Sequence, residues 1–337
     1  MKRARLIATG WDRDLEISKV ETPPVAGNQV LVEVAACGVC YRDIVDRDGR
    51  FAFIRIPVSP GHEVTGRVAA VGPSVTEWKV GDRVSTMHRD SCGACPACAA
   101  GDTSLCDRAA AVLGLIVDGG YATHLVVPER ALYAAPADIS APAAAVLHCT
   151  FGTAYRGLTR FGRPGPGDRV VITGANGGVG CAAVQIARRL GAEVVAVVRD
   201  EAAVEFVAGL GANDVVVDPG DGFHKRIGAR RADVALDCVG QPTFNASLRS
   251  VRVGGRLVVV GNVVPERANL NLGYVITRGI VIVGSSGANR DDMAAVLALH
   301  AAEPLSFQVT EMSLDRADEA QRAVRAGGLR GRIALVP

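Results

Sequence analysis

Residues 170–180 read VVITGANGGVG, and this stretch decides the fold. An apolar run that favours a β-strand leads into a glycine-rich turn, and residues 179–190 then place apolar side chains at helical spacing, with Gly191 as the expected stop. A glycine cluster alone would equally fit a tight turn without a ligand. A strand, a glycine turn and a helix in immediate succession instead favour a dinucleotide site, because the helix N-terminus attracts a pyrophosphate.

The glycines of this turn have separate expected roles. Gly174 permits the tight turn, whereas Gly180 lets the helix lie close to the strand. Gly177 and Gly178 let backbone N–H groups approach the pyrophosphate. The cofactor contacts predicted here are Gly174, Asn176, Gly177, Gly178, Val179 and Gly180.

The residues after this turn alternate between strand-like and helix-like patterns, which predicts a parallel sheet with right-handed crossovers. Together with residues 170–173, the strand-like runs number six, as in a doubly wound dinucleotide-binding sheet. We therefore predict an α/β fold with a Rossmann doubly wound six-stranded parallel sheet. The five further runs are residues 193–198, 214–217, 234–237, 256–260 and 280–283.

The chain before residue 145 follows another pattern, with short apolar runs broken by Gly and Pro, which predicts an irregular, mostly β body. The last stretch, residues 291–337, ends in GRIALVP, which we expect to be a strand that returns to this first domain. We predict a mostly β catalytic domain from residues 1–150 and 286–337, and a Rossmann domain from residues 151–285. The β-like runs are residues 30–35, 64–71, 83–86 and 125–127.

Composition excludes several classes of function. A chain of 337 residues is long enough for two domains. A formal charge of +2 gives too weak a field to favour a nucleic-acid or anionic-membrane partner, and no apolar run reaches membrane-spanning length. Asp12 and Asp14 interrupt the N-terminal stretch before a signal peptide could form, so we expect a cytoplasmic protein with reduced thiols and a small-molecule substrate.

The end of the second Rossmann strand selects the dinucleotide, because a carboxylate there holds the ribose hydroxyls of NAD and an arginine accommodates the 2′-phosphate of NADP. Residues 194–202 read VVAVVRDEA and place Val198 and Arg199 at this position. We therefore predict NADP(H) in preference to NAD(H). A shift of one residue would instead make Asp200 the ribose carboxylate.

Cys92, Cys95, Cys98 and Cys106 follow the pattern C-x2-C-x2-C-x7-C. Four thiolates complete the tetrahedral coordination of zinc and leave no open position, so this lobe, about residues 90–107, predicts a structural zinc site. An iron–sulfur cluster is the alternative, because thiolate ligation alone does not exclude iron.

Several motifs in a fixed order give the chain a family resemblance. They are GVCYRD at residues 38–43, PGHEVTG at 60–66, the four-cysteine lobe, HCTFGTAYRGL at 148–158 and the glycine turn. In this order they resemble the zinc-containing medium-chain dehydrogenase/reductases, the superfamily of the alcohol dehydrogenases. The resemblance covers nearly the whole chain and implies a GroES-like catalytic domain before the Rossmann domain.

By resemblance, Cys40, His62 and Cys149 are the ligands of a second, catalytic zinc. Glu63 takes the place of a carboxylate that can bind the metal when the substrate position is empty, and Asp43 would orient a ligand such as His62. Three ligands and one exchangeable position suit Lewis-acid chemistry on a substrate oxygen. Taken singly, His62 or Cys149 could instead be ordinary core residues. The resemblance also implies cofactor contacts at Thr153, Val239, Gly261 and Ser285.

Two further residues, Cys37 and His148, leave alternatives open. Cys37 and Cys40 could form a C-x2-C pair of their own, but in the family the ligand is the cysteine that is shortly followed by an aspartate, here Asp43, so we interpret Cys37 as packing. His148 or water would carry the proton of the reaction.

Arg42 departs from the alcohol dehydrogenases, which usually carry a Ser or Thr there that starts a proton relay. The segment CYRD, with GQPTF at residues 240–244, GNVVPE at 261–266 and NLGY at 271–274, resembles an acryloyl-CoA reductase-like branch, in which Arg42 could help to hold an acyl carrier's phosphates.

Reversible alcohol/carbonyl chemistry with NADP(H) is the first hypothesis. Enoyl-thioester reduction is the second, and a non-enzymatic cofactor-binding relative is the third. The resemblance further suggests a homodimer or homotetramer, in which residues 270–283 could supply an edge strand.

Overall fold

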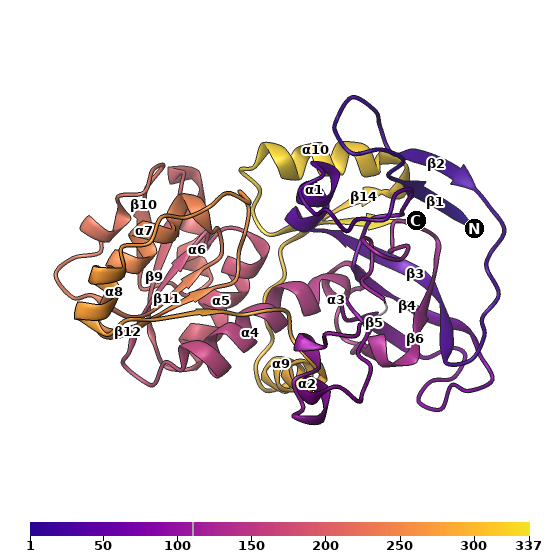
Figure 1. Cartoon of the computed structure of the whole chain (residues 1–337), viewed down its shortest axis with the longest axis horizontal. Helices are drawn as coiled ribbons and strands as arrows, with labels where there is room; N and C mark the ends of the chain where they lie inside the picture. Colours follow the sequence, from indigo (N-terminus) through magenta and orange to yellow (C-terminus); the bar gives the residue numbers. More distant parts are fainter. Residues whose placement is uncertain (110) are drawn as a thin grey trace.

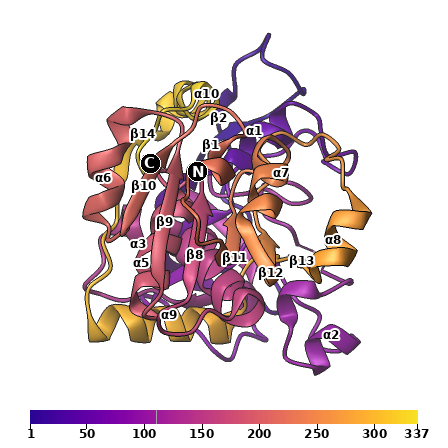
Figure 2. The ribbon, with the colours of Figure 1, turned by 90° about the vertical axis from the view of Figure 1, so that its left-hand side faces the viewer.

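The computed structural model describes residues 1–109 and 111–337. Its parallel sheet has the strand order β10-β9-β8-β11-β12-β13, and every neighbouring pair is parallel (Figures 1 and 2). The chain thus winds outward from β8 in both directions, and the predicted doubly wound sheet is confirmed. The strands are β8 (Arg169–Thr173), β9 (Glu193–Val198), β10 (Asp214–Val217), β11 (Ala232–Asp237), β12 (Val251–Val259) and β13 (Val281–Gly284).

The helix after the glycine turn forms where the sequence predicts it. Helix α5 (Gly178–Arg189) buries its apolar face against the sheet. A Cβ atom on Gly180 would lie 2.2 Å from the carbonyl oxygen of Gly174, so only glycine allows the helix to begin this close to the strand end. The other helices of this part are α6 (Val204–Gly209), α7 (Gln241–Ser250) and α8 (Leu272–Arg278).

A second sheet, with the order β14-β15-β3-β4-β5-β7, forms the mostly β part of the molecule, and β6 also pairs with β3. The predicted C-terminal strand does return to this part, because β15 pairs antiparallel with β3. The strand predicted at residues 30–35 is longer than expected and leads directly to Cys40. The strands are β3 (Gln29–Val39), β4 (Glu63–Val71), β5 (Arg83–Thr86), β6 (His124–Pro128), β7 (Leu132–Ala134), β14 (Val309–Ser313) and β15 (Arg332–Val336), with β1 (Lys2–Arg5) and β2 (Glu16–Lys19) as a separate antiparallel pair.

Helices interrupt the mostly β part at places that matter for the site. Helix α1 (Tyr41–Arg47) begins directly after Cys40, and α2 (Pro96–Ala99) lies within the four-cysteine lobe. The chain from residue 141 to residue 162 is one unbroken helical run. Its segments are α3 (Ala141–Leu147), η3 (His148–Gly152), α4 (Thr153–Arg156) and η4 (Gly157–Gly162), and the C-terminal part adds α9 (Arg290–Ala302) and α10 (Ala317–Ala326).

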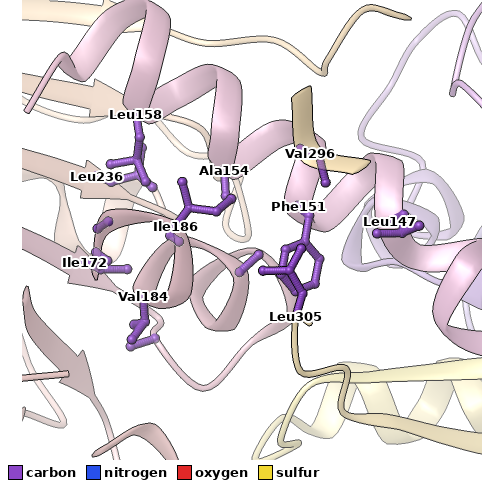
Figure 3. Close-up of a cluster of buried hydrophobic side chains, with 14 of the residues drawn as sticks. Leu147, Phe151, Ala154, Leu158, Ile172, Val184, Ile186, Leu236, Val296 and Leu305 are labelled. Atoms are coloured by element: carbon purple, nitrogen blue, oxygen red, sulfur yellow. The ribbon is translucent and has the colours of Figure 1, made fainter. Parts of the chain in front are cut away.

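This helical run joins the two sheets through one apolar core. Leu147 and Phe151 belong to the same buried cluster as Ile172 of β8, Ile186 of α5 and Val296 of α9 (Figure 3). Burying such side chains contributes about 1.5–3 kcal/mol each. The run carries Cys149 and Thr153, so the core fixes both residues relative to the parallel sheet. The domain division at residues 150 and 285 stays a prediction.

Candidate active site

A cleft of about 720 Å³ opens along the carboxyl ends of the parallel strands. Ligands bind at this edge of open α/β sheets because the loops that follow the strands diverge there. Every residue predicted from the sequence to contact the dinucleotide lines the cleft. They are Thr153, Gly174, Asn176, Gly177, Gly178, Val179, Gly180, Val198, Arg199, Val239, Gly261 and Ser285.

The three proposed catalytic ligands meet in this cleft, although they are far apart in the chain. The Sγ atoms of Cys40 and Cys149 are 3.8 Å apart, and the Sγ of Cys149 is 3.5 Å from Nε2 of His62. Two thiolates on one tetrahedral zinc would be roughly 3.8 Å apart, and a thiolate and an imidazole roughly 3.6 Å apart. With a Glu63 oxygen, all four ligand atoms lie within 4.8 Å of one another, so the set fits zinc.

Asp43 lies behind the ligand set. Its Oδ1 is 3.4 Å from Nδ1 of His62, the nitrogen on the far side of the ring from the cysteines. Its Oδ2 accepts hydrogen bonds from the backbone N–H of Cys40 at 3.0 Å and from the hydroxyl of Tyr121 at 3.1 Å. A carboxylate in this position fixes the orientation and tautomer of a histidine ligand, which supports the predicted role of Asp43.

Arg332 is a site residue that the sequence did not reveal. This first residue of β15 places Nη2 at 3.1 Å from Oε1 of Glu63 and donates to the Sγ atoms of Cys40 and Cys149 at 3.5 and 3.9 Å. Burial raises the pKa of Glu63 to about 7, and Arg332 opposes this shift. The guanidinium therefore compensates a cluster of buried negative charge. Only the pairing of β15 with β3 brings it there, and no nearby motif signals it.

Arg42 lines the cleft, but protein groups hold most of its guanidinium. Its Nε donates to Asp46 at 3.1 Å, and its Nη2 donates to the carbonyl oxygen of Leu113 at 2.6 Å. These bonds fix the side chain on the cleft wall. Its predicted contact with substrate stays a prediction.

The two candidates for dinucleotide selection differ in where their side chains go. Asp200 accepts a hydrogen bond from the backbone N–H of Ala202 at 2.9 Å and so caps the short helix that follows. Arg199 lines the cleft instead, and its Nη2 would be 2.8 Å from a Cβ on Gly327, across from the strand end. This geometry favours Arg199 over Asp200 as the residue that faces the ribose.

Asn176 has a structural partner besides its place in the cleft. Its side-chain amide donates to the carbonyl oxygen of Leu329 at 2.9 Å, and its own carbonyl accepts from the N–H of Gly331. The glycine turn is thereby tied to the loop before β15. This loop also lines the cleft, so the C-terminal segment forms part of its wall.

His148 is unsuited to the proton-carrying role considered for it. Its Nε2 lies 3.0 Å from the carbonyl oxygen of Ala288, which requires the proton to be on that nitrogen, and Nδ1 is sealed from solvent without a partner. Burial lowers the pKa of His148 to about 4. The ring is therefore neutral, with its N–H already used.

The four cysteines of the lobe converge on a second point. Cys92 and Cys98 have Sγ atoms 4.0 Å apart, those of Cys95 and Cys106 are 3.9 Å apart, and all four lie within 4.8 Å of one another. The backbone N–H groups of Ala94 and Cys95 donate to the Sγ of Cys92 and lower its pKa to about 6. The set therefore favours a tetrahedral metal bound by thiolates.

Comparisons with known proteins agree with this geometry. A family model described as "Alcohol dehydrogenase GroES-like domain" matches residues 26–137, and one described as "Zinc-binding dehydrogenase" matches residues 178–302. The acryloyl-coenzyme A reductase of Metallosphaera sedula is 35% identical over 299 residues, which cover 88% of each chain. An alcohol dehydrogenase of Geobacillus stearothermophilus is 33% identical over 332 residues, covering 96% of this chain and 97% of its own.

Solved structures show the same similarity. The crystal structure of AibC has a TM-score of 0.92 with 38% identity, and the match covers 100% of this chain and 96% of that chain. A crystal structure of an NAD-dependent alcohol dehydrogenase also has a TM-score of 0.92, with 29% identity and 100% of both chains covered.

Proposed function

The chain belongs to the zinc-containing medium-chain dehydrogenase/reductase superfamily, and from this premise we propose that it is a zinc-dependent oxidoreductase that transfers hydride between NADP(H) and a small alcohol or carbonyl substrate. One observation carries the proposal. The Cys40, His62 and Cys149 ligand atoms and the whole predicted dinucleotide site line one cleft.

The residues of the cleft have separate proposed roles. Cys40, His62 and Cys149 would hold the catalytic zinc, and the four lobe cysteines would hold a second, structural zinc. The catalytic metal supplies a Lewis acid that polarises a substrate C–O bond, and the dinucleotide supplies or accepts hydride. Asp43 fixes the His62 ring, Arg332 neutralises Glu63, and the glycine turn positions the phosphates. The helices in the described part of the chain lack the length and hydrophobicity that a membrane span needs.

Arg199→Ala tests the preference for NADP(H). Removing a guanidinium that faces the 2′-phosphate is expected to weaken NADPH binding by about 10- to 100-fold, the effect of a lost charge-assisted hydrogen bond, and to leave NADH binding unchanged. Fluorescence titration of both coenzymes measures this. Arg249→Ala, an exposed arginine outside the cleft, is the charge-matched control. Equal effects of Arg199→Ala on NADPH and NADH would contradict the assignment.

Enoyl-thioester reduction is the second candidate, favoured by two relatives named acryloyl-coenzyme A reductase and by Arg42 on the cleft wall. Oxidation of NADPH, followed by the loss of its near-ultraviolet absorbance, separates the candidates when a panel of aldehydes is compared with acryloyl-CoA. We expect turnover of aldehydes, which is reversed with alcohols and NADP. Turnover of the thioester alone would reject carbonyl chemistry. Binding of coenzyme without any turnover would favour a non-enzymatic relative.

We also propose that the chain forms a homodimer or homotetramer. Of residues 270–283, which the sequence suggested as an edge strand, Leu272–Arg278 form helix α8, and only the end of the stretch belongs to β13, an edge of the parallel sheet. Val281 on β13 and Ile276 on α8 are 40% and 75% exposed. An exposed apolar sheet edge is a natural surface for pairing with a second copy. Val281→Lys is expected to shift the protein to monomers in sedimentation velocity, whereas the wild type sediments as a dimer or larger. A monomeric wild type would contradict this.

A further inference from the structure

His88 is a polar residue in the cleft to which the proposed chemistry gives no role. It follows β5 and is half-buried, and it lines the cleft beside Cys40, His62 and Cys149. Its ring lies against that of His148, with centroids 5.3 Å apart. His148 precedes the ligand Cys149, so His88 lies on the wall next to the reacting end of the cleft.

Nε2 is the ring nitrogen of His88 that is left for a ligand, because Nδ1 lies against Gly287, where a Cβ would be 2.8 Å from it. Within the described chain, no protein group forms a hydrogen bond with the ring, and Nε2 is not sealed from solvent as Nδ1 of His148 is. Burial lowers the pKa of His88 well below its ordinary value, and His148, His62 and Arg42 act in the same direction. The ring is therefore neutral, with one nitrogen that donates and one that accepts.

The protein holds this ring in place. The backbone carbonyl of His88 accepts from the N–H of Leu113 at 3.1 Å, and the N–H of the preceding residue, Met87, donates to Ala131. A Cβ on Gly287 would lie 2.6 Å from Cε1 of His88, so the ring fits only because a glycine faces it. The backbone bonds and the contact with Gly287 therefore restrict where the ring can lie on the cleft wall.

An apolar occupant would be unfavourable at this point. Covering Nε2 of His88 without a hydrogen bond costs about 1–3 kcal/mol, because the ring loses its water and gains no partner. A hydroxyl group avoids this cost with either tautomer, since it both donates and accepts. His88 lies against the ring of His148, the residue before the proposed ligand Cys149, so we place that hydroxyl near the reacting carbon.

We propose that His88 is a specificity-determining residue that hydrogen-bonds a hydroxyl group on the carbon next to the reacting carbonyl, so that the preferred substrates are small α-hydroxy carbonyl compounds or the corresponding vicinal diols. The inference rests on the proposed function in that it requires the substrate to occupy this cleft. It adds a substrate class that the ligand set and the coenzyme site do not define.

Two unreactive amides test the inference without turnover. Lactamide and isobutyramide differ only in a hydroxyl or a methyl group beside the carbonyl. We expect the NADPH-loaded protein to bind lactamide about tenfold more tightly in calorimetry, because a site built to hydrogen-bond rejects the analogue that lacks the group. In His88→Phe the two amides should bind equally, and in His88→Gln, which keeps a donor and an acceptor, part of the preference should return.

The same variants can be assayed with a matched pair of ketones, 1-hydroxy-2-butanone and 3-pentanone, and the ratio of their kcat/KM values should follow the amide ratio. Tyr155→Phe, a variant of a partly buried residue outside the cleft, is the control and should keep the wild-type preference.

Equal binding of the amides by the wild type, no measurable binding of lactamide, or an unchanged preference in His88→Phe with its metal content intact would overturn the inference. A lactamide preference lost in His88→Phe, in a protein that turns over no carbonyl compound, would reject the proposed function and leave the role of His88 standing.

Discussion

Cys149→Ala is expected to lower kcat/KM by about a thousandfold or more and to reduce the zinc content from two ions per chain to one. Lewis-acid stabilisation contributes several kcal/mol to such reactions, and each 1.36 kcal/mol is about a factor of ten in rate. Cys149 is one of three ligands whose donor atoms meet within the cleft, and removing one thiolate leaves Cys40 and His62 with an incomplete set.

The measurement combines steady-state kinetics with elemental analysis of the purified protein. Cys37→Ala is the matched control, because Cys37 is a buried cysteine on β3, three residues before Cys40, and we interpret it as packing. This control should keep two zinc ions. NADPH binding by Cys149→Ala should persist, which shows that the fold survives. Two zinc ions and normal kinetics in Cys149→Ala would refute the catalytic zinc.

Cys106→Ser is expected to remove the metal of the four-cysteine lobe and to lower the melting temperature by about 10 °C. A ligand present at about 1,000 times its Kd stabilises the folded state by about 4 kcal/mol, and 1 kcal/mol shifts Tm by roughly 2–4 °C in a chain of this order of size. The lobe depends on its metal because it has little apolar core. Helix α2 has no buried residue, and Leu105 is 52% exposed.

Calorimetry and elemental analysis of the same samples check this prediction. Leu105→Ser, next to Cys106 but with its side chain largely in solvent, is the control and should keep both the metal and the Tm. Iron in place of zinc would favour the iron–sulfur alternative. An unchanged Tm after loss of the metal would show that contacts such as the ion pair between Asp102 and Arg156 are sufficient to hold the lobe.

Local sequence patterns were sufficient for the parallel sheet and the lobe. The alternation of apolar runs, the glycine turn and Gly191 predict strands and a helix, because period and turn residues act over a few positions. The four cysteines lie within fifteen residues, so their spacing alone predicts that the thiolates converge. The structure places these elements as expected.

Only the tertiary structure decided how distant segments meet at the cleft. Cys40, His62 and Cys149 are joined in the sequence only by a family resemblance, and the structure brings their donor atoms together. Arg332 reaches Glu63 because β15 pairs with β3, a strand near the other end of the chain. His88 faces the cleft because Gly287 leaves room for its ring. Such contacts depend on long-range strand pairing and packing, which leave no periodic signal near either residue. The sequence by itself therefore determined the strands of the parallel sheet, the glycine turn and the lobe, whereas folding determined which side chains face the cleft.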